Sequence, residues 1–135
     1  MLYFLDTNIC IFYMRKGQYE GIIKSKVIQH GLKNIKIPAI VMAELMHGAH
    51  KSKKSAETLK ATREFIANFE IIPFDFMEAK LYGQIRANLE RKGQLISNND
   101  MLIAATALAY NATLITNNTQ EFSRIDGLNL DNWTL

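Results

Sequence analysis

Short runs of largely apolar residues recur along the chain, and each is followed by a segment with a helical pattern. The clearest are residues 2–5 (LYFL) and 112–115 (ATLI), with others at residues 35–37 and 70–73. An apolar run of this length is typical of a strand buried on both faces of a parallel sheet. Strands that alternate with helices predict an α/β domain, a mainly parallel sheet flanked by helices.

The segments between these runs are expected to be helical. The predicted helices cover residues 7–15, 19–30, 39–50, 56–68, 75–92 and 100–110, and a last strand is expected near residues 128–130. Asp75 and Glu78 have the spacing of a capping box. Asn98 or Asn99 is the expected cap of the helix that begins at Asp100.

Length and composition are those of one ordinary globular domain, residues 1–135, without repeats or linkers. The formal net charge of +3 favours anionic partners slightly. Cys10 has no second cysteine to pair with, so a reduced, cytoplasmic setting is expected. Residues 101–120 carry no charge, but asparagines and threonines divide them into a helix and a strand. We therefore expect no membrane span.

Three carboxylates lie beside or within strongly apolar segments. Asp6 directly follows LYFL, Glu44 lies inside PAIVMAELM, and Asp100 precedes MLIAATALA. A charge in such surroundings needs a counter-charge, hydrogen bonds or a metal ion. Asp6 and Asp100 are explained equally well as residues at helix N-termini, whereas Glu44 lies in mid-helix and caps nothing. Glu121, in the turn expected after residues 112–115, is a fourth candidate.

These carboxylates are expected to meet at one edge of the sheet. Asp6 and residues 116–118 each follow a predicted strand directly, and ligands bind at the carboxyl edge of such sheets. Several carboxylates without a balancing cation predict Mg²⁺ or Mn²⁺, which prefer oxygen ligands, and a phosphodiester substrate. Zinc is disfavoured because Glu44 and His50, six residues apart, diverge around their helix, although each shares a face with His47, and because the H-E-x-x-H spacing is absent.

Four segments, in order along nearly the whole chain, carry a resemblance to a known family. They are FLDTNICIFYMRK, AELMHGAHKS, YGQIRANLERKGQLISNNDMLIAATALA and LITNNTQEFSRIDGLNLDNW. Together they resemble the PIN-domain ribonucleases of the VapC type, which are toxins of bacterial VapBC toxin–antitoxin modules. The resemblance implies the PIN-domain fold, a compact, mainly parallel sheet with helices on both faces. It also implies Mg²⁺- or Mn²⁺-dependent cleavage of single-stranded RNA, commonly transfer RNA, which inhibits translation and growth.

The resemblance implies roles for individual residues. Asp6 of the DTN motif, Glu44 of the AEL motif and Asp100 of the NDxxIA helix match the metal-binding carboxylates. The fourth acidic position stays open: either Glu121 supplies a carboxylate, or Asn118 serves as a neutral ligand or water-holder. The polar positions that usually orient these carboxylates correspond to Thr7, Asn8 and Thr116.

Candidate contacts with RNA and protein partners follow from charge and from the resemblance. Lys51, Lys53 and Lys54 belong to a basic stretch that a solvated helix face explains equally well. Arg86, in YGQIRANL, is the better candidate because its surroundings resemble those in the family. The family implies a homodimer inhibited by a VapB antitoxin whose C-terminal segment covers the active site. Apolar residues at 9–14 and 40–46 are assigned to the core in preference to a groove for that partner.

Two other classes of function compete with a ribonuclease. A phosphatase of the haloacid-dehalogenase type also has an aspartate after its first strand, but it needs a second two residues later, where this chain has Asn8. A catalytically silent binding module would lack the acidic set, of which at least three members remain. Incubation with transfer RNA, with Mg²⁺ or with EDTA, separates the three classes.

Overall fold

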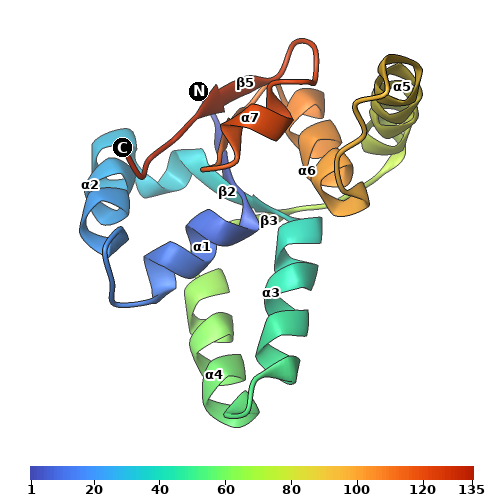
Figure 1. Ribbon diagram of the computed structural model, residues 1–135. Coiled ribbons are helices and arrows are strands. Elements are labelled where there is room, and N and C mark those ends of the chain that lie inside the picture. The colour runs from blue at the N-terminus through green and yellow to red at the C-terminus, as the bar shows by residue number, and fades with distance from the viewer.

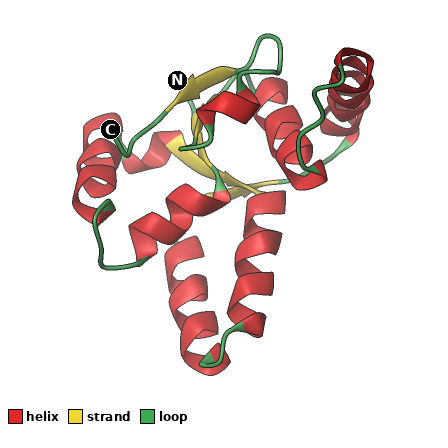
Figure 2. Ribbon diagram, viewed as in Figure 1, coloured by secondary structure: helices red, strands yellow, loops and turns green.

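The computed structural model describes residues 1–135 and contains a five-stranded sheet surrounded by helices (Figures 1 and 2). The central strand β1 (Tyr3–Leu5) lies between β2 (Ile35–Pro38) and β4 (Thr113–Ile115). Beyond β2 lies β3 (Glu70–Ile72), and beyond β4 lies β5 (Asn129–Asp131). Every neighbouring pair is parallel, so the sheet is wholly parallel and the α/β prediction is confirmed.

The central strands are continuous apolar runs because helices cover both of their faces. Phe4 and Leu5 in β1 and Leu114 and Ile115 in β4 are fully buried. The strands expected at residues 2–5, 35–37, 70–73 and 112–115 are confirmed, with ends that shift by one residue. The last strand runs one residue further along the chain than expected, and its alternate residues are exposed because it forms the edge of the sheet.

Four helices connect the first three strands: α1 (Thr7–Met14), α2 (Glu20–His30), α3 (Ala39–Lys51) and α4 (Ser55–Ile66). A short 3₁₀ helix (Leu32–Asn34) links α2 to β2. The hairpin formed by α3 and α4 projects away from the sheet, at the bottom of Figure 1. Consequently α3 is exposed at Ala43, His47 and Gly48, although its sequence is apolar around most of its surface.

Three helices follow β3: α5 (Phe76–Lys92), α6 (Asn98–Ala109) and α7 (Thr119–Phe122). The connection from β3 to β4 runs back across the sheet, so a right-handed crossover places α6 on the face opposite α1–α4. Residues 103–107 of α6 are all buried, and α5 packs along the outer side of α6 (Figure 2). No helix combines the length and the apolar character that a membrane crossing requires.

The predicted ends of α5 are confirmed. The capping box is present, with the backbone N–H of Asp75 donating to Glu78 Oε1 at 2.7 Å. Gly93 ends the helix in the left-handed conformation, with φ of +64°, which a residue with a Cβ adopts only with strain.

Two local expectations after α5 are wrong. The cap of α6 is Ser97, whose Oγ accepts from the backbone N–H of Asp100 at 3.2 Å, so the helix begins at Asn98 and not at Asp100. Ser97, Asn98 and Asn99 are three adjacent residues of good capping type, and pattern alone does not choose among them. Glu121 lies on the short helix α7, where a turn was expected.

Candidate functional site

The Asp6 carboxylate lies at the carboxyl edge of the sheet, between β1 and α1. Its side chain is 6% exposed. Oδ1 accepts a hydrogen bond from the backbone N–H of Ile9 at 3.0 Å, so Asp6 is the N-cap of α1. The backbone N–H of Asp6 donates to the carbonyl of Ile115 in β4, also at 3.0 Å. Capping, one of the two explanations for Asp6 left open by the sequence, is therefore real, and it fixes the carboxylate at this edge.

The end of β4 meets the end of β1, as predicted. Thr116 is fully buried, and its Oγ1 accepts from the backbone N–H of Asn118 at 2.9 Å. The same side chain lies close enough to the Asp6 carboxylate to lower its pKa. The structure therefore brings Thr116 beside Asp6, and its role in orienting the carboxylate stays a prediction.

The pKa of Asp6 reflects the charges of other carboxylates nearby. Burial raises the pKa of Asp6 from 3.8 to about 6, and the negative charges of Asp100 and Glu44 raise it as well. Hydrogen bonds from Thr116 and from the Ile9 amide lower it without cancelling the effect of burial. A carboxyl group with this pKa is easily neutralised, either by a proton or by a cation.

The Asp100 carboxylate, in the first turn of α6, belongs to the same group. Burial raises the pKa of Asp100, a hydrogen bond with Ser97 lowers it, and the charges of Glu44 and Glu121 raise it. The charges of Glu44, Asp100 and Glu121 therefore reach Asp6 or Asp100, although each of the four carboxylates comes from a different place in the fold. Asp6 follows β1, Glu44 lies on α3, and Asp100 and Glu121 lie on α6 and α7.

Glu44 is held by a residue of another helix. The hydroxyl of Thr7, the first residue of α1, donates to Glu44 Oε1 at 2.6 Å. This bond joins α1 to α3 beside Asp6 and restricts the Glu44 side chain. Asn8, a further predicted supporting residue, is exposed and forms no side-chain hydrogen bond within the chain. Its supporting role stays a prediction.

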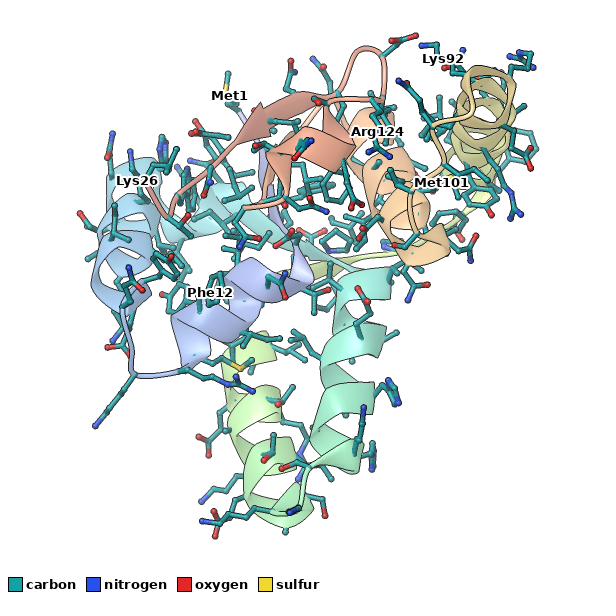
Figure 3. All side chains as sticks on the ribbon, in the orientation of Figure 1. Met1, Phe12, Lys26, Lys92, Met101 and Arg124 are labelled. Carbon is teal, nitrogen blue, oxygen red and sulfur yellow. The ribbon has the colours of Figure 1, made fainter.

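A second contact fixes the position of α7 relative to α6. Arg124, two residues after α7 and labelled in Figure 3, donates from Nη1 to the carbonyl oxygens of Leu95 and Gln94 at 3.3 and 3.5 Å. These carbonyls belong to the segment that leads into α6, so the contact ties the end of α7, which carries Glu121, to the approach to Asp100. Arg124 leaves no signal in the sequence because its partners are backbone atoms.

The site contains an uncompensated negative charge. The four ion pairs of the chain lie elsewhere on the surface: Lys24–Glu20, Lys36–Glu70, Arg86–Glu90 and Lys92–Asp126. A half-buried group of oxygen donors without a basic partner fits a hard divalent cation. No three acidic, histidine or cysteine side chains lie together closely enough to hold a metal ion as they stand, so at most two of these carboxylates would bind an ion directly without side-chain movement. This arrangement is compatible with Mg²⁺, which usually keeps several waters and takes one or two carboxylates directly.

The predicted RNA-binding residues fall in two places. Lys51, Lys53 and Lys54 are exposed at the tip of the α3–α4 hairpin. Glu44 and Lys51 are separated by a rise of about 10 Å along α3, so the structure does not bring these lysines to the carboxylates. Arg86, on α5, is exposed and is linked through Tyr82 to the start of α6. Tyr82 was not identified from the sequence, although its i, i+4 spacing with Arg86 signals a shared helix face.

A groove of about 420 Å³ opens beside Glu44, between α1, α3 and α4. Ile11 and Met14 of α1 line it while also packing against the hydrophobic core, so the predicted core stretch borders the groove. The core assignment is correct for Ile9 and Val41, which are fully buried. Glu44 lines both this groove and the acidic site, so the two are continuous.

Comparisons with known proteins agree with this architecture. The family model of the PIN domain matches residues 3–128. A protein of Rickettsia felis named ribonuclease VapC2 is 43% identical over 133 residues, 98% of each chain. A tRNA(fMet)-specific endonuclease VapC of Shigella flexneri is 33% identical over 132 residues, again 98% of each chain. The crystal structure of VapBC2 from Rickettsia felis bound to a promoter DNA fragment contains a chain that superposes with a TM-score of 0.90. That chain is 43% identical, and the match covers 98% of this chain and 99% of that one.

Proposed function

The chain belongs to the PIN-domain family and, within it, to the VapC ribonucleases, and on this basis we propose that it is an endoribonuclease toxin dependent on Mg²⁺ or Mn²⁺. The observation that carries the proposal is the group of four carboxylates at the carboxyl edge of the sheet. Negative charge from the others contributes to the raised pKa values of Asp6 and Asp100, and no ion pair of the chain involves any of the four. Carboxylates that lie close together without a basic partner are typical of a cation-binding functional site, whereas a structural ion pair would include a basic side chain.

Asp6, Glu44 and Asp100 are the residues that would hold the ion. Glu121 is the candidate fourth carboxylate, and Asn118 is the neutral alternative. When bound, a divalent ion supplies positive charge that activates water for attack on phosphorus and stabilises the leaving oxygen. The donor set is compatible with Mn²⁺ as a substitute, because both ions take oxygen ligands.

The chain's own residues prepare the site before any ligand enters. The Ile9 amide holds one oxygen of the Asp6 carboxylate, Thr116 lies beside it, and Thr7 holds Glu44 through a 2.6 Å hydrogen bond. Because these supports are buried or half-buried, the carboxylates of Asp6 and Glu44 keep their directions without a metal. Preorganised charge of this kind costs little reorganisation during the reaction.

The substrate and partners are proposed by analogy with the relatives. The Shigella flexneri relative is named for an endonuclease specific for tRNA(fMet), and we assign this chain the broader class, transfer RNA. The solved Rickettsia felis relative is a VapBC complex, and we propose a VapB-type antitoxin as the inhibitor. Its segment would occupy the groove between α1, α3 and α4, beside Glu44. A homodimer in the cytoplasm is the expected state, and light scattering of the purified protein tests the dimer.

The deciding experiment is cleavage of transfer RNA by the purified protein with Mg²⁺, with EDTA, and with EDTA followed by excess Mg²⁺. We expect cleavage in the first and third conditions only. Asp6→Asn should be inactive, whereas Asp126→Asn, an exposed aspartate paired with Lys92 at 3.5 Å, should cleave like the parent. Cleavage that persists in EDTA contradicts the metal dependence, and cleavage by Asp6→Asn contradicts the site.

A further inference from the structure

A chain of hydrogen bonds joins α5 to the beginning of α6. Arg86 Nη1 donates to the hydroxyl oxygen of Tyr82 at 2.9 Å, and the Tyr82 hydroxyl donates to Asn98 Oδ1. Tyr82 and Arg86 are one turn apart on α5, and Asn98 is the first residue of α6. The contact therefore ends two residues before Asp100.

The Arg86 guanidinium is held from two directions. On the other side from Tyr82, its Nε lies 3.7 Å from Glu90 Oε2, one turn further along α5. The hydrogen bond from Arg86 to Tyr82 also raises the pKa of this guanidinium, with Glu90 adding to the effect. The group remains exposed, so its other N–H donors face solvent. An arginine restrained in this way loses less freedom when it binds an anion.

The position of Arg86 relative to the carboxylates indicates which anion it would meet. Asn98 and Asp100 are two residues apart, so they point to nearly opposite sides of α6. Asp100 is influenced by Glu44 of α3 and Glu121 of α7, whereas Asn98 contacts α5, the outer neighbour of α6 in Figure 1. A helix with its side chains is about 10–12 Å across. Arg86 therefore lies across α6 from the carboxylates, so an RNA phosphate that it binds is a different one from the phosphate being cleaved.

We propose that Tyr82 is a positioning residue whose hydroxyl holds Arg86 where it binds an RNA phosphate adjacent to the cleaved one. The inference rests on the proposed ribonuclease function and extends it to a second phosphate position on the substrate. A contact with a flanking phosphate is the same in the ground state and in the transition state. Its loss therefore raises KM and leaves kcat unchanged.

A double-mutant cycle with Tyr82→Phe and Arg86→Ala tests this directly, with transfer RNA as the substrate. Phenylalanine keeps the ring and removes only the hydroxyl. We expect Arg86→Ala to raise KM about tenfold and Tyr82→Phe about threefold, each with kcat within about twofold of the parent. The double variant should be no worse than Arg86→Ala alone, because Tyr82 acts through Arg86. Arg91→Ala, an exposed arginine on the same helix outside this network, is the matched control and should keep the parental KM.

The salt dependence of RNA binding gives a readout that a purely structural role does not change. Measured in the inactive Asp6→Asn background, the slope of log affinity against log salt should fall by about 0.7 when Arg86 is removed. Tyr82→Phe should lower this slope by a smaller amount.

Two results would overturn the role of Tyr82 while the ribonuclease function stands. One is a parental KM in Tyr82→Phe. The other is a fall in kcat that persists in the Arg86→Ala background, which would mean that Tyr82 acts on Asp100 through Asn98. Failure of the parent protein to cleave RNA would overturn the proposed function and this inference together.

Discussion

Replacing Asp6 by asparagine should stabilise the metal-free protein while abolishing its activity. The carboxylate is 6% exposed, and burial raises its pKa from 3.8 to about 6. The folded protein therefore binds the Asp6 proton more tightly than the unfolded chain does. Asparagine keeps a side-chain oxygen that can accept from the Ile9 amide and cap α1, and it carries no charge to bury.

The expected gain follows from the size of the pKa change. A tenfold change in an acid constant is worth about 1.4 kcal/mol, so raising the pKa from 3.8 to about 6 corresponds to about 3 kcal/mol. The charge of Asp6 does not destabilise the protein below pH 4, where the carboxyl group is protonated in both the folded and the unfolded chain. The destabilisation grows as the pH rises from the unfolded pKa of 3.8 to the folded pKa of about 6, and it is complete above pH 6. At pH 7 the substitution should raise Tm by roughly 10 °C for a domain of this size.

The assay is thermal and urea unfolding of the parent and Asp6→Asn proteins in EDTA at pH 3.5, 5 and 7.5, repeated with Mg²⁺ at pH 7.5. In EDTA the two proteins should be equally stable at pH 3.5, and the variant should be the more stable at pH 7.5. Mg²⁺ should stabilise the parent, by about 2.7 kcal/mol at a hundred times its Kd, and leave the variant unchanged. The exposed variant Asp126→Asn should stay within about 0.5 kcal/mol of the parent throughout.

Two outcomes would refute the reasoning. If Asp6→Asn is less stable than the parent in EDTA at pH 7.5, the carboxylate is stabilising and its burial is compensated within the chain. If the difference between the two proteins does not change with pH, its cause is not the charge of Asp6.

Three further predictions concern the support of the site and the core. Thr7→Val removes the donor to Glu44 and should weaken Mg²⁺ binding or activity about 10- to 100-fold, measured by Mg²⁺ titration of cleavage. At subsaturating Mg²⁺, kcat/KM should fall about tenfold per pH unit below pH 6, because protons compete with the metal for Asp6, whose pKa burial raises to about 6. Trp133→Ala empties a fully buried position and should cost about 3–5 kcal/mol in urea unfolding.

The parts of the fold that the sequence predicts correctly are those where burial leaves a local signal. The central strands β1 and β4 are uninterrupted apolar runs because both faces of the sheet are covered. Parallel pairing then brings the residues that follow each strand to one edge. For this reason the proximity of Asp6 and Thr116 is predictable from order along the chain, and the structure confirms it.

Other parts depend on contacts that leave no local signal. The helix α7 is a single turn, Thr119–Phe122, too short to show a helical period, yet it sets where Glu121 lies relative to Asp100. The exposure of one side of α3 follows from the way the α3–α4 hairpin projects, which is a tertiary property. Tyr82 has the sequence features of any helical tyrosine, and only packing of α5 against α6 brings it to Asn98. The roles assigned to the individual site residues stay predictions until the variants are measured.

The central position of β1 has a consequence for when the protein can act during its own synthesis. Tyr3 pairs with Ile35 of β2 on one side and with Thr113 of β4 on the other. One edge of β1 therefore has no partner until β4 has been synthesised. Until residues 113–116 have left the ribosome, Asp6 has neither its backbone bond to Ile115 nor its contact with Thr116. Two of the remaining carboxylates, Asp100 and Glu121, are also encoded late. A nascent chain therefore cannot assemble this site beside the translation machinery that is making it, and cleavage begins only after the sheet has closed around its first strand.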